Sequence, residues 1–231
     1  MVSVISEIGV NWDGDFDLAK KMMSNAKTLG FNAVKFQAFN EDTLGNHTHL
    51  DRLMKSAITE KNVQRIDEIA NDVGIEWFCT PMYPEAVSFL NPFVNRFKIR
   101  EIDGRALLSD QKTPLIETII DTGKEIFVSS EKSPESCKYY HDSNIKWLYC
   151  VPKYPCTLDE INFKEISKFH GYSNHCPDIT APITATISGV DIIEVHVTED
   201  KTKDYFDNNV SFDFSELKIL IAEIKKINKN N

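Results

Sequence analysis

The amino-acid sequence predicts an α/β protein folded as a single (β/α)8 (TIM) barrel. Short apolar runs alternate with longer stretches in which apolar residues recur at helical spacing. Strands that alternate with helices favour a parallel sheet with right-handed crossovers. Eight such units divide the 231 residues into lengths of roughly 29 residues, which suits a closed barrel. We therefore expect one barrel domain that spans residues 1–231.

Each expected strand is a short apolar run that ends in a polar residue or a turn. The strands are expected at residues 2–8, 33–37, 75–79, 96–100, 125–129, 145–149, 171–173 and 191–197. Helices are expected at residues 16–29 and 60–73, after Pro84, at 114–121, after Ser133, and at 163–168, 179–188 and 214–227. The long connection at residues 38–59 is long enough to cover a substrate. The turn after the first strand, residues 9–14, does not match GxGxxG, which argues against the rival open dinucleotide-binding sheet.

Composition and charge argue against several classes of protein. The net charge is −9, and the sequence lacks the clustered lysines and arginines that a nucleic-acid surface needs. No apolar run reaches the roughly 18 residues of a membrane span, and the N-terminus lacks the features of a signal peptide. The five cysteines contain no CxxC pair, which argues against a disulfide framework or a zinc ribbon. We expect a cytoplasmic protein that binds neither nucleic acid nor membrane.

Polar residues stand at or just after the end of every expected strand. In barrels of this class the active site lies at these carboxyl ends. The residues are Glu7, Lys35, Gln37, Thr80, Lys98, Arg100, Asp103, Ser129, Tyr154, Ser173, His175 and His196. One polar residue at a strand end is ordinary, but a ring of them with several cations predicts a binding site.

The cations at the strand ends predict an anion site. Lys35 and Lys98 lie among apolar neighbours, so both should point into the barrel, and Arg100 should share the face of Lys98. A buried lysine without a partner is costly. We expect these cations to bind a phosphate or a carboxylate, and salt bridges to Glu7 or Glu194 are the alternative.

Two histidines end adjacent strands. His175 and His196 could share one divalent metal ion and leave coordination positions open for a substrate. Either histidine alone would more often be a hydrogen-bonded residue at the rim. Cys150 and Cys176 are close in sequence to this region, and packing as small buried side chains is favoured over ligation for both.

These same stretches resemble the N-acetylneuraminate (sialic acid) synthase family. Residues 7–14, Glu7-Ile8-Gly9-Val10-Asn11-Trp12-Asp13-Gly14, are similar to the family's opening motif EIGxNHxG. Further similar motifs follow in the family's order: Val34-Lys35-Phe36-Gln37, Cys79-Thr80-Pro81, Phe97-Lys98-Ile99, Tyr154-Pro155, Gly171-Tyr172-Ser173-Asn174-His175 and Ile193-Glu194-Val195-His196. The resemblance covers nearly the whole chain.

The resemblance implies an enzyme that condenses phosphoenolpyruvate with a sugar aldehyde similar to N-acetylmannosamine. The products would be a nonulosonic (sialic-acid-type) sugar acid and phosphate. The resemblance implies that Mn²⁺ or Mg²⁺ binds to His175 and His196. It places phosphoenolpyruvate near Lys35, Lys98, Thr80, Ser129 and Ser173. It places the sugar near Glu7, Gln37, Asp103, Tyr154 and Asp207, and makes Glu7, Lys35, Lys98 and Asp103 catalytic.

The sequence departs from the family after Lys98-Ile99. Where the family has glycine, serine, glycine and glutamate, this chain has Arg100-Glu101-Ile102-Asp103. Glu101 replaces a serine that contacts phosphate, and a carboxylate would repel phosphate. Arg100 could compensate by binding phosphate through two hydrogen bonds.

Other departures lie elsewhere in the chain. Trp12 and Tyr149 replace histidines, and Pro152 stands where an asparagine that reaches the ligand is usual. Family members commonly continue into a small antifreeze-like domain that reaches across a dimer, so a homodimer is an expectation. We expect the barrel alone here. These departures leave two alternatives: a barrel that binds a sugar phosphate or a partner without turnover, and another metal-dependent aldolase on this fold.

Overall fold

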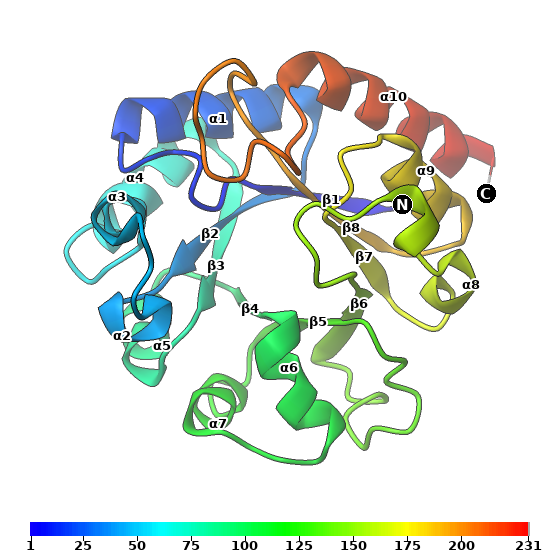
Figure 1. Cartoon of the computed structure of the whole chain (residues 1–231), viewed down its shortest axis with the longest axis horizontal. Helices are drawn as coiled ribbons and strands as arrows, with labels where there is room; N and C mark the ends of the chain where they lie inside the picture. The colour runs from blue at the N-terminus through cyan, green and yellow to red at the C-terminus, as the bar shows by residue number, and fades with distance from the viewer. Residues whose placement is uncertain (231) are drawn as a thin grey trace.

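The computed structural model describes residues 1–230 and shows eight parallel strands closed into a barrel with helices around it (Figure 1). The strands are β1 (Ser3–Glu7), β2 (Ala33–Ala38), β3 (Glu76–Pro81), β4 (Arg96–Ile99), β5 (Glu125–Ser130), β6 (Ile145–Tyr149), β7 (Gly171–Asn174) and β8 (Ile192–His196). Each strand pairs with its neighbour in the sequence, and β8 pairs with β1 to close the ring. The predicted (β/α)8 barrel is confirmed.

The helices form the outer layer that covers the strands (Figure 1). They are α1 (Phe16–Leu29), α2 (Glu41–Leu44), α3 (Leu50–Lys55), α4 (Val63–Val73), α5 (Pro84–Leu90), α6 (Glu101–Leu108), α7 (Pro114–Ile120), α8 (Phe163–Ile166), α9 (Thr180–Ile187) and α10 (Phe214–Asn230), with a short 3-10 helix at Leu158–Glu160. Helix α1 shows how local sequence sets their ends. The Asp15 side chain accepts from two backbone N–H groups of its first turn, and Gly30 ends it with φ of 94°.

Inward-facing side chains fill the barrel in layers. At the amino-terminal ends of the strands, the guanidinium of Arg96 lies 5.7 Å and 5.2 Å from the ring centres of Phe78 and Phe127. The same guanidinium pairs with the carboxylates of Glu76 and Glu125, each at 3.0 Å. These contacts join three adjacent strands, β3, β4 and β5.

Two expectations about helices were wrong. No helix follows β5: residues 133–144 are turns and bends, although Ser133-Pro134 is typical of a helix start. The tyrosine, histidine, aspartate, serine and asparagine residues of that segment have weak helix propensity. An unexpected helix, α6, begins directly after β4, so the strand ends at Ile99 and Arg100 is the N-cap of α6.

Gly104 makes the close packing of α6 possible. A Cβ atom at this position would lie 2.8 Å from the carbonyl oxygen of Ser129. The segment 38–59, expected as a long loop, contains the short helices α2 and α3.

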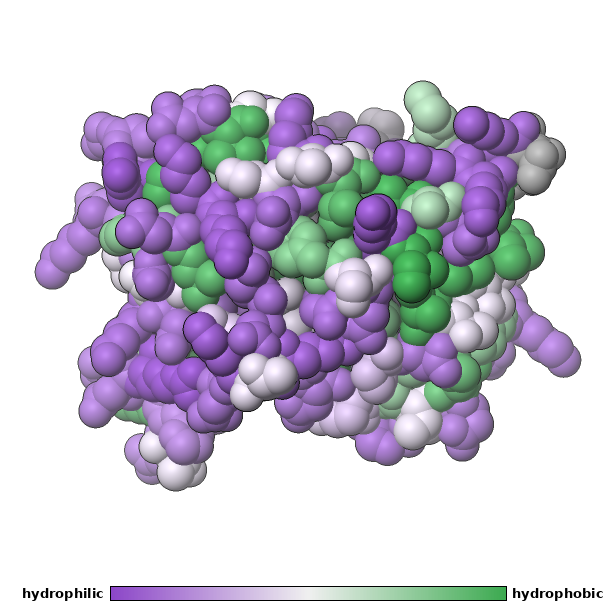
Figure 2. All heavy atoms as spheres, turned by 90° about the horizontal axis from the view of Figure 1, so that it is seen from above, coloured by the Kyte–Doolittle hydropathy of each residue, from purple (hydrophilic) through white to green (hydrophobic). Residues whose placement is uncertain are grey.

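The surface on the side of α1 and α10 is mostly hydrophilic, with apolar side chains gathered toward one end (Figure 2). Ile187 of α9 and Ile219 of α10 are among the exposed large apolar residues. Within residues 1–230, none of the helices has both the length and the apolar character needed to cross a membrane.

The contacts of Arg96 with the two carboxylates and the two rings should contribute strongly to the stability of the fold. We expect Arg96→Ala to lower the free energy of unfolding by about 2 kcal/mol, because two charge-assisted contacts and the cover over two rings are lost. Urea denaturation measures this change. The control is Arg65→Ala, which removes an exposed arginine of α4 that pairs only with Glu68, and which should change stability by less than about 0.5 kcal/mol. Equal effects of the two variants would contradict the role given to Arg96.

Candidate active site

A cavity of about 440 Å³ opens at the carboxyl ends of the strands. Its wall contains most of the residues that the sequence analysis selected. They are Glu7, Lys35, Gln37, Thr80, Lys98, Arg100, Ser129, Tyr154, Ser173, His175, His196 and Asp207. Asp103 is the one selected residue that does not line the cavity, because its carboxylate faces Arg100 instead.

Two lysines and two glutamates form a buried ionic cluster at the floor of the cavity. Lys35 Nζ lies 2.9 Å from Glu7 Oε2 and 3.7 Å from Glu194 Oε1. Lys98 Nζ donates to Glu194 Oε1 at 2.7 Å. All four side chains are at most 5% exposed. The salt-bridge alternative therefore describes the contacts of both lysines, and the binding of an external anion stays a prediction.

The pKa values of the two lysines in this cluster are shifted in opposite directions. Burial disfavours the charge of Lys35, but Glu194 and Glu7 outweigh burial and raise the pKa of Lys35 above its ordinary value. Burial lowers the pKa of Lys98, and Glu194 offsets burial only in part. Burial alone would raise the pKa of Glu194, but Lys35 and Lys98 hold this pKa below its ordinary value. Glu194 is thus a carboxylate that two cations share.

Hydroxyl groups surround the same cluster. Ser173 Oγ donates to Glu194 Oε1 at 2.8 Å, and Thr80 Oγ1 accepts from Lys35 at 3.2 Å. Ser129 is 3% exposed, and its Oγ has no hydrogen-bond partner among the described residues. A buried hydroxyl without a partner is costly, so Ser129 marks a place where a ligand atom would complete the site.

The end of β4 differs from what strand alternation predicted. Arg100 Nε donates to Asp103 Oδ2 at 2.7 Å, so its guanidinium is tied to α6 rather than to Lys98. Glu101 lines the cavity, but its carboxylate pairs with Arg105 one turn along the helix, at 2.8 Å. Arg100 therefore lines the same cavity as Lys35 and Lys98, but its guanidinium is paired with Asp103, because β4 ends at Ile99 and α6 begins directly afterwards.

His175 is held as a neutral imidazole. Burial and then the neighbouring His196 lower the pKa of His175 to about 3. Its Nδ1 lies 2.7 Å from the carbonyl oxygen of Val151, which assigns the proton to Nδ1. Its Nε2 accepts from the hydroxyl of Tyr154 at 2.6 Å, although Tyr154 is 54% exposed at the rim.

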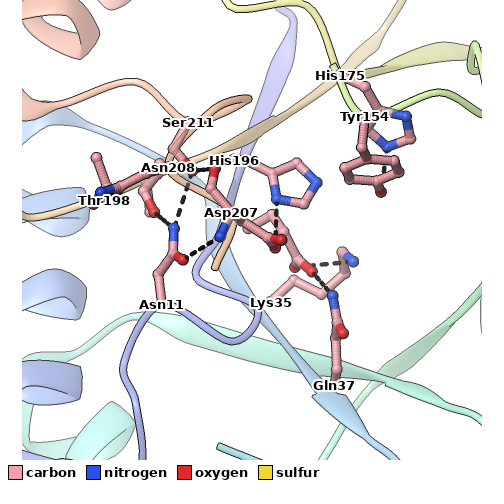
Figure 3. A network of polar contacts seen from close by, with 12 residues as sticks. Asn11, Lys35, Gln37, Tyr154, His175, His196, Thr198, Asp207, Asn208 and Ser211 are labelled. Carbon is pink, nitrogen blue, oxygen red and sulfur yellow. Dashed lines mark hydrogen bonds and ion pairs between the residues drawn. The ribbon is translucent and has the colours of Figure 1, made fainter. Parts of the chain in front are cut away.

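His196 is backed by a carboxylate from the loop after β8 (Figure 3). Its Nδ1 lies 3.2 Å from Asp207 Oδ2, close enough for an ion pair but without the geometry of a hydrogen bond. The backbone N–H of Asp207 donates to the side chain of Asn11 at 3.0 Å. Asn11 also donates to the carbonyl oxygen of Val197 and to the hydroxyl of Ser211. It therefore connects the loop after β8 to the turn after β1.

The two imidazoles suit a shared divalent ion by their arrangement. Their ring centres lie 5.5 Å apart, which is compatible with nitrogens at about 2.1 Å from one ion. Each Nδ1 faces an oxygen from behind, the usual support for a metal-binding histidine. Within residues 1–230, no group of three or more histidine, cysteine, aspartate or glutamate side chains is arranged to hold an ion.

Comparison with known proteins identifies the family. Residues 22–231 match the sequence model of the NeuB family. The chain belongs to the NeuB family.

Named relatives of this NeuB-family chain include synthases of sialic-acid-type sugars. It is 30% identical to the N,N'-diacetyllegionaminic acid synthase of Legionella pneumophila, over 96% of this chain and 71% of that protein. It is also 30% identical to an uncharacterized protein of Methanocaldococcus jannaschii, over 98% of this chain and 71% of that protein. The crystal structure of the N-acetylneuraminic acid (sialic acid) synthetase of Leptospira borgpetersenii, in complex with citrate, superposes with a TM-score of 0.87. That comparison covers 99% of this chain and 84% of the other, with 28% identity.

The substituted family positions have structural roles in this NeuB-family chain. Trp12 is fully buried, and its Nε1 donates to the carbonyl oxygen of Ser56 at 2.9 Å. Tyr149 is also buried, and its hydroxyl accepts from the N–H of Asn162. Pro152 lines the cavity. The replaced histidines are therefore core positions here.

Sequence reasoning missed part of the site. Glu194 was considered only as a salt-bridge partner, although its place two residues before His196 on the same strand face was a usable signal. The apolar outer wall was not predicted at all. It comprises Val10, Phe39, Leu44, Leu53, Met82 and Phe206. Most of this wall belongs to loops and short helices whose direction no sequence pattern indicates.

Glu194 provides a test of the ionic cluster. We expect Glu194→Gln to lower the free energy of unfolding by about 3–5 kcal/mol at about pH 7, because Lys35 and Lys98 lose their shared carboxylate. Without it the pKa of Lys98 falls further below its unfolded value of about 10.4. The folded state then binds fewer protons than the unfolded state, so stability rises with pH up to that value.

The decrease in the free energy of unfolding caused by Glu194→Gln should therefore be smaller at about pH 9.5 than at about pH 7. Urea denaturation at both pH values measures it. Glu68→Gln, on the exposed face of α4, is the control and should have little effect at either pH. A loss of the same size at both pH values would show that lysine charge is not its cause.

Proposed function

We propose that this NeuB-family chain condenses phosphoenolpyruvate with a sugar aldehyde similar to N-acetylmannosamine. The products would be a nonulosonic sugar acid and inorganic phosphate. One observation carries the proposal: the buried lysines, a serine hydroxyl without a hydrogen-bond partner among the described residues, and the imidazoles of His175 and His196 line one cavity at the barrel mouth. The named synthase relatives support the same chemistry.

The floor of the cavity would bind phosphoenolpyruvate. Lys98 uses one of its three N–H donors on Glu194, so the others are available to an anion. Ser129 offers a hydroxyl with no other partner, and Ser173 and Thr80 lie beside the lysines. The anion would share the lysines with Glu7 and Glu194, which limits how much negative charge the floor can accept.

The imidazoles of His175 and His196 would hold Mn²⁺ or Mg²⁺ through Nε2. A divalent ion there would polarise the aldehyde oxygen and fix the carbonyl beside phosphoenolpyruvate. The protein prepares this arrangement by keeping His175 neutral and by placing Asp207 behind His196. The hydroxyl of Tyr154 has to leave Nε2 of His175 first.

Glu7 would assist the bond changes. Attack of C3 of phosphoenolpyruvate on the aldehyde carbon forms the new C–C bond, and the aldehyde oxygen takes up a proton. Positive charge then develops at C2, which a buried carboxylate such as Glu7 stabilises. Water adds at C2 and gives one proton to a base. The new hydroxyl group then loses its proton as the bond between C2 and the phosphate oxygen breaks, which releases phosphate, takes up that proton on the phosphate, and leaves the ketone.

A phosphate-release assay tests this proposal. The protein is incubated with phosphoenolpyruvate, Mn²⁺ and a panel of aldoses, with and without N-acyl groups. We expect release that needs both substrates and that falls by at least about 100-fold in His175→Ala and His196→Ala, because ligand loss removes metal-assisted catalysis. Arg65→Ala is the matched surface control.

Other outcomes of this assay would identify the alternatives. Binding of phosphoenolpyruvate without release from any aldose would favour a barrel that binds without turnover. Aldol cleavage that consumes no phosphoenolpyruvate would favour another metal-dependent aldolase. Either result would contradict the proposed synthase.

Arg100 tests the altered end of β4. If Arg100 turns from Asp103 toward the phosphate, Arg100→Ala should raise the apparent KM for phosphoenolpyruvate by about 10- to 150-fold, the value of one charge-assisted hydrogen bond. Glu101→Ser should lower that KM, because it removes a carboxylate from the cavity wall. Steady-state kinetics with phosphoenolpyruvate varied measures both changes. Unchanged KM in both variants would mean that neither residue contacts the phosphate.

A further inference from the structure

Arg52 of α3 joins three loops at the mouth of the cavity. Its Nε donates to Asp13 Oδ1 at 3.1 Å, in the turn between β1 and α1. Its Nη1 donates to Asp204 Oδ2 at 3.0 Å, and its Nη2 donates to the backbone carbonyl of Asp204, in the loop after β8. The guanidinium also lies over the ring of Phe206, 4.7 Å from its centre. One side chain therefore holds together segments that are far apart in the sequence.

The loop that Arg52 holds supplies two residues of the cavity wall. Phe206 and Asp207 both line the cavity, and Asp207 lies behind His196. Asn11 fastens the same loop from the inner side, through the backbone N–H of Asp207 and the hydroxyl of Ser211 (Figure 3). Arg52 holds the same loop at Asp204 and Phe206, which come before Asp207 in the sequence.

The contacts need an arginine in particular. A guanidinium is planar, so it stacks on Phe206 while its edge donates to Asp13 and Asp204 in different directions. A lysine ammonium at this position would keep the charge but could not make the stacked and forked contacts together. Asp13 has φ of 50°, a conformation that aspartate tolerates better than most residues.

We infer that Arg52 is a positioning residue that holds Phe206 and Asp207 against the cavity mouth. It contacts neither the ionic cluster nor the imidazoles, and acts through the loop that carries Asp207. Loss of Arg52 leaves the inner contacts of Asn11 in place, so the loop loosens on its outer side while the barrel stays folded. The part of the inference that concerns catalysis rests on the proposed function, and the part that concerns the loop does not.

Hydrogen exchange tests the effect on the loop. In Arg52→Ala, the amides of Tyr205, Asn208 and Val210, which donate to carbonyl groups within this loop, should exchange at least about fivefold faster. Strand amides of β1–β8 should keep their wild-type rates. Arg52→Lys should give a smaller acceleration, and it provides the same measurement if Arg52→Ala does not fold. Arg65→Ala, an exposed arginine of α4, should change no loop amide.

Wild-type exchange of the loop amides in both Arg52 variants would overturn the inference. Acceleration spread equally over the strands would overturn it too, because Arg52 would then stabilise the whole fold and not the loop.

Steady-state kinetics tests the consequence for the site. With the proposed reaction, Arg52→Ala should raise the KM for the sugar aldehyde by about fivefold or more and leave the KM for phosphoenolpyruvate within about twofold. The reason is that Phe206 and Asp207 lie at the mouth, whereas the lysines lie at the floor. Arg52→Lys should recover part of the aldehyde KM. Equal changes in both KM values, or no change in either, would overturn the positioning role.

The two experiments separate the two proposals. If the wild-type protein releases no phosphate with any aldose, the proposed function fails, and the exchange rates still decide whether Arg52 holds the loop.

Discussion

The site depends on the ionic cluster in which Lys35 and Lys98 share Glu194. Four charged side chains at the centre of a barrel are tolerated only because each cation lies against a carboxylate. This pairing explains how the floor of the cavity can be polar while the strands that form it remain buried. It also places two carboxylates beside two ammonium groups, so the formal charges of the cluster balance.

Above this floor, strand ends and loops make different contributions to the surroundings of the two imidazoles. The ends of two adjacent strands place the imidazoles beside each other: His196 is the last residue of β8, and His175 directly follows the last residue of β7. The loops supply what stands behind or over the imidazoles: Val151 and Tyr154 for His175, and Asp207 for His196. The strand ends thus set the positions of the two imidazoles, and the loops supply the groups that contact them.

The barrel and most of the cavity wall could be predicted from the sequence because strand alternation is a local rule. Lys35, Lys98, Ser173, His175 and His196 line the cavity as their strand positions predicted. Prediction failed where the chain leaves a strand. Arg100 had the parity of Lys98, but helix α6 begins there, and its close packing depends on the missing side chain of Gly104. Residues 133–144 failed for the opposite reason, since a good helix start is followed by residues that do not sustain a helix. The apolar wall and the contacts of Arg52 join distant segments, and no periodicity in one sequence reports such contacts.

The three-loop contact at Arg52 limits how the mouth of this barrel can change during evolution or in the laboratory. Barrel enzymes are often modified by exchanging one loop at a time, on the assumption that each loop is an independent module. Here residues 13, 52 and 204 belong to three different connections and share one guanidinium. A grafted segment 38–59 without an arginine at position 52 would leave Asp13 and Asp204 without their common partner, so the loop after β8 would have to be transferred with it. The unit of exchange at this mouth is therefore a set of loops rather than a single one.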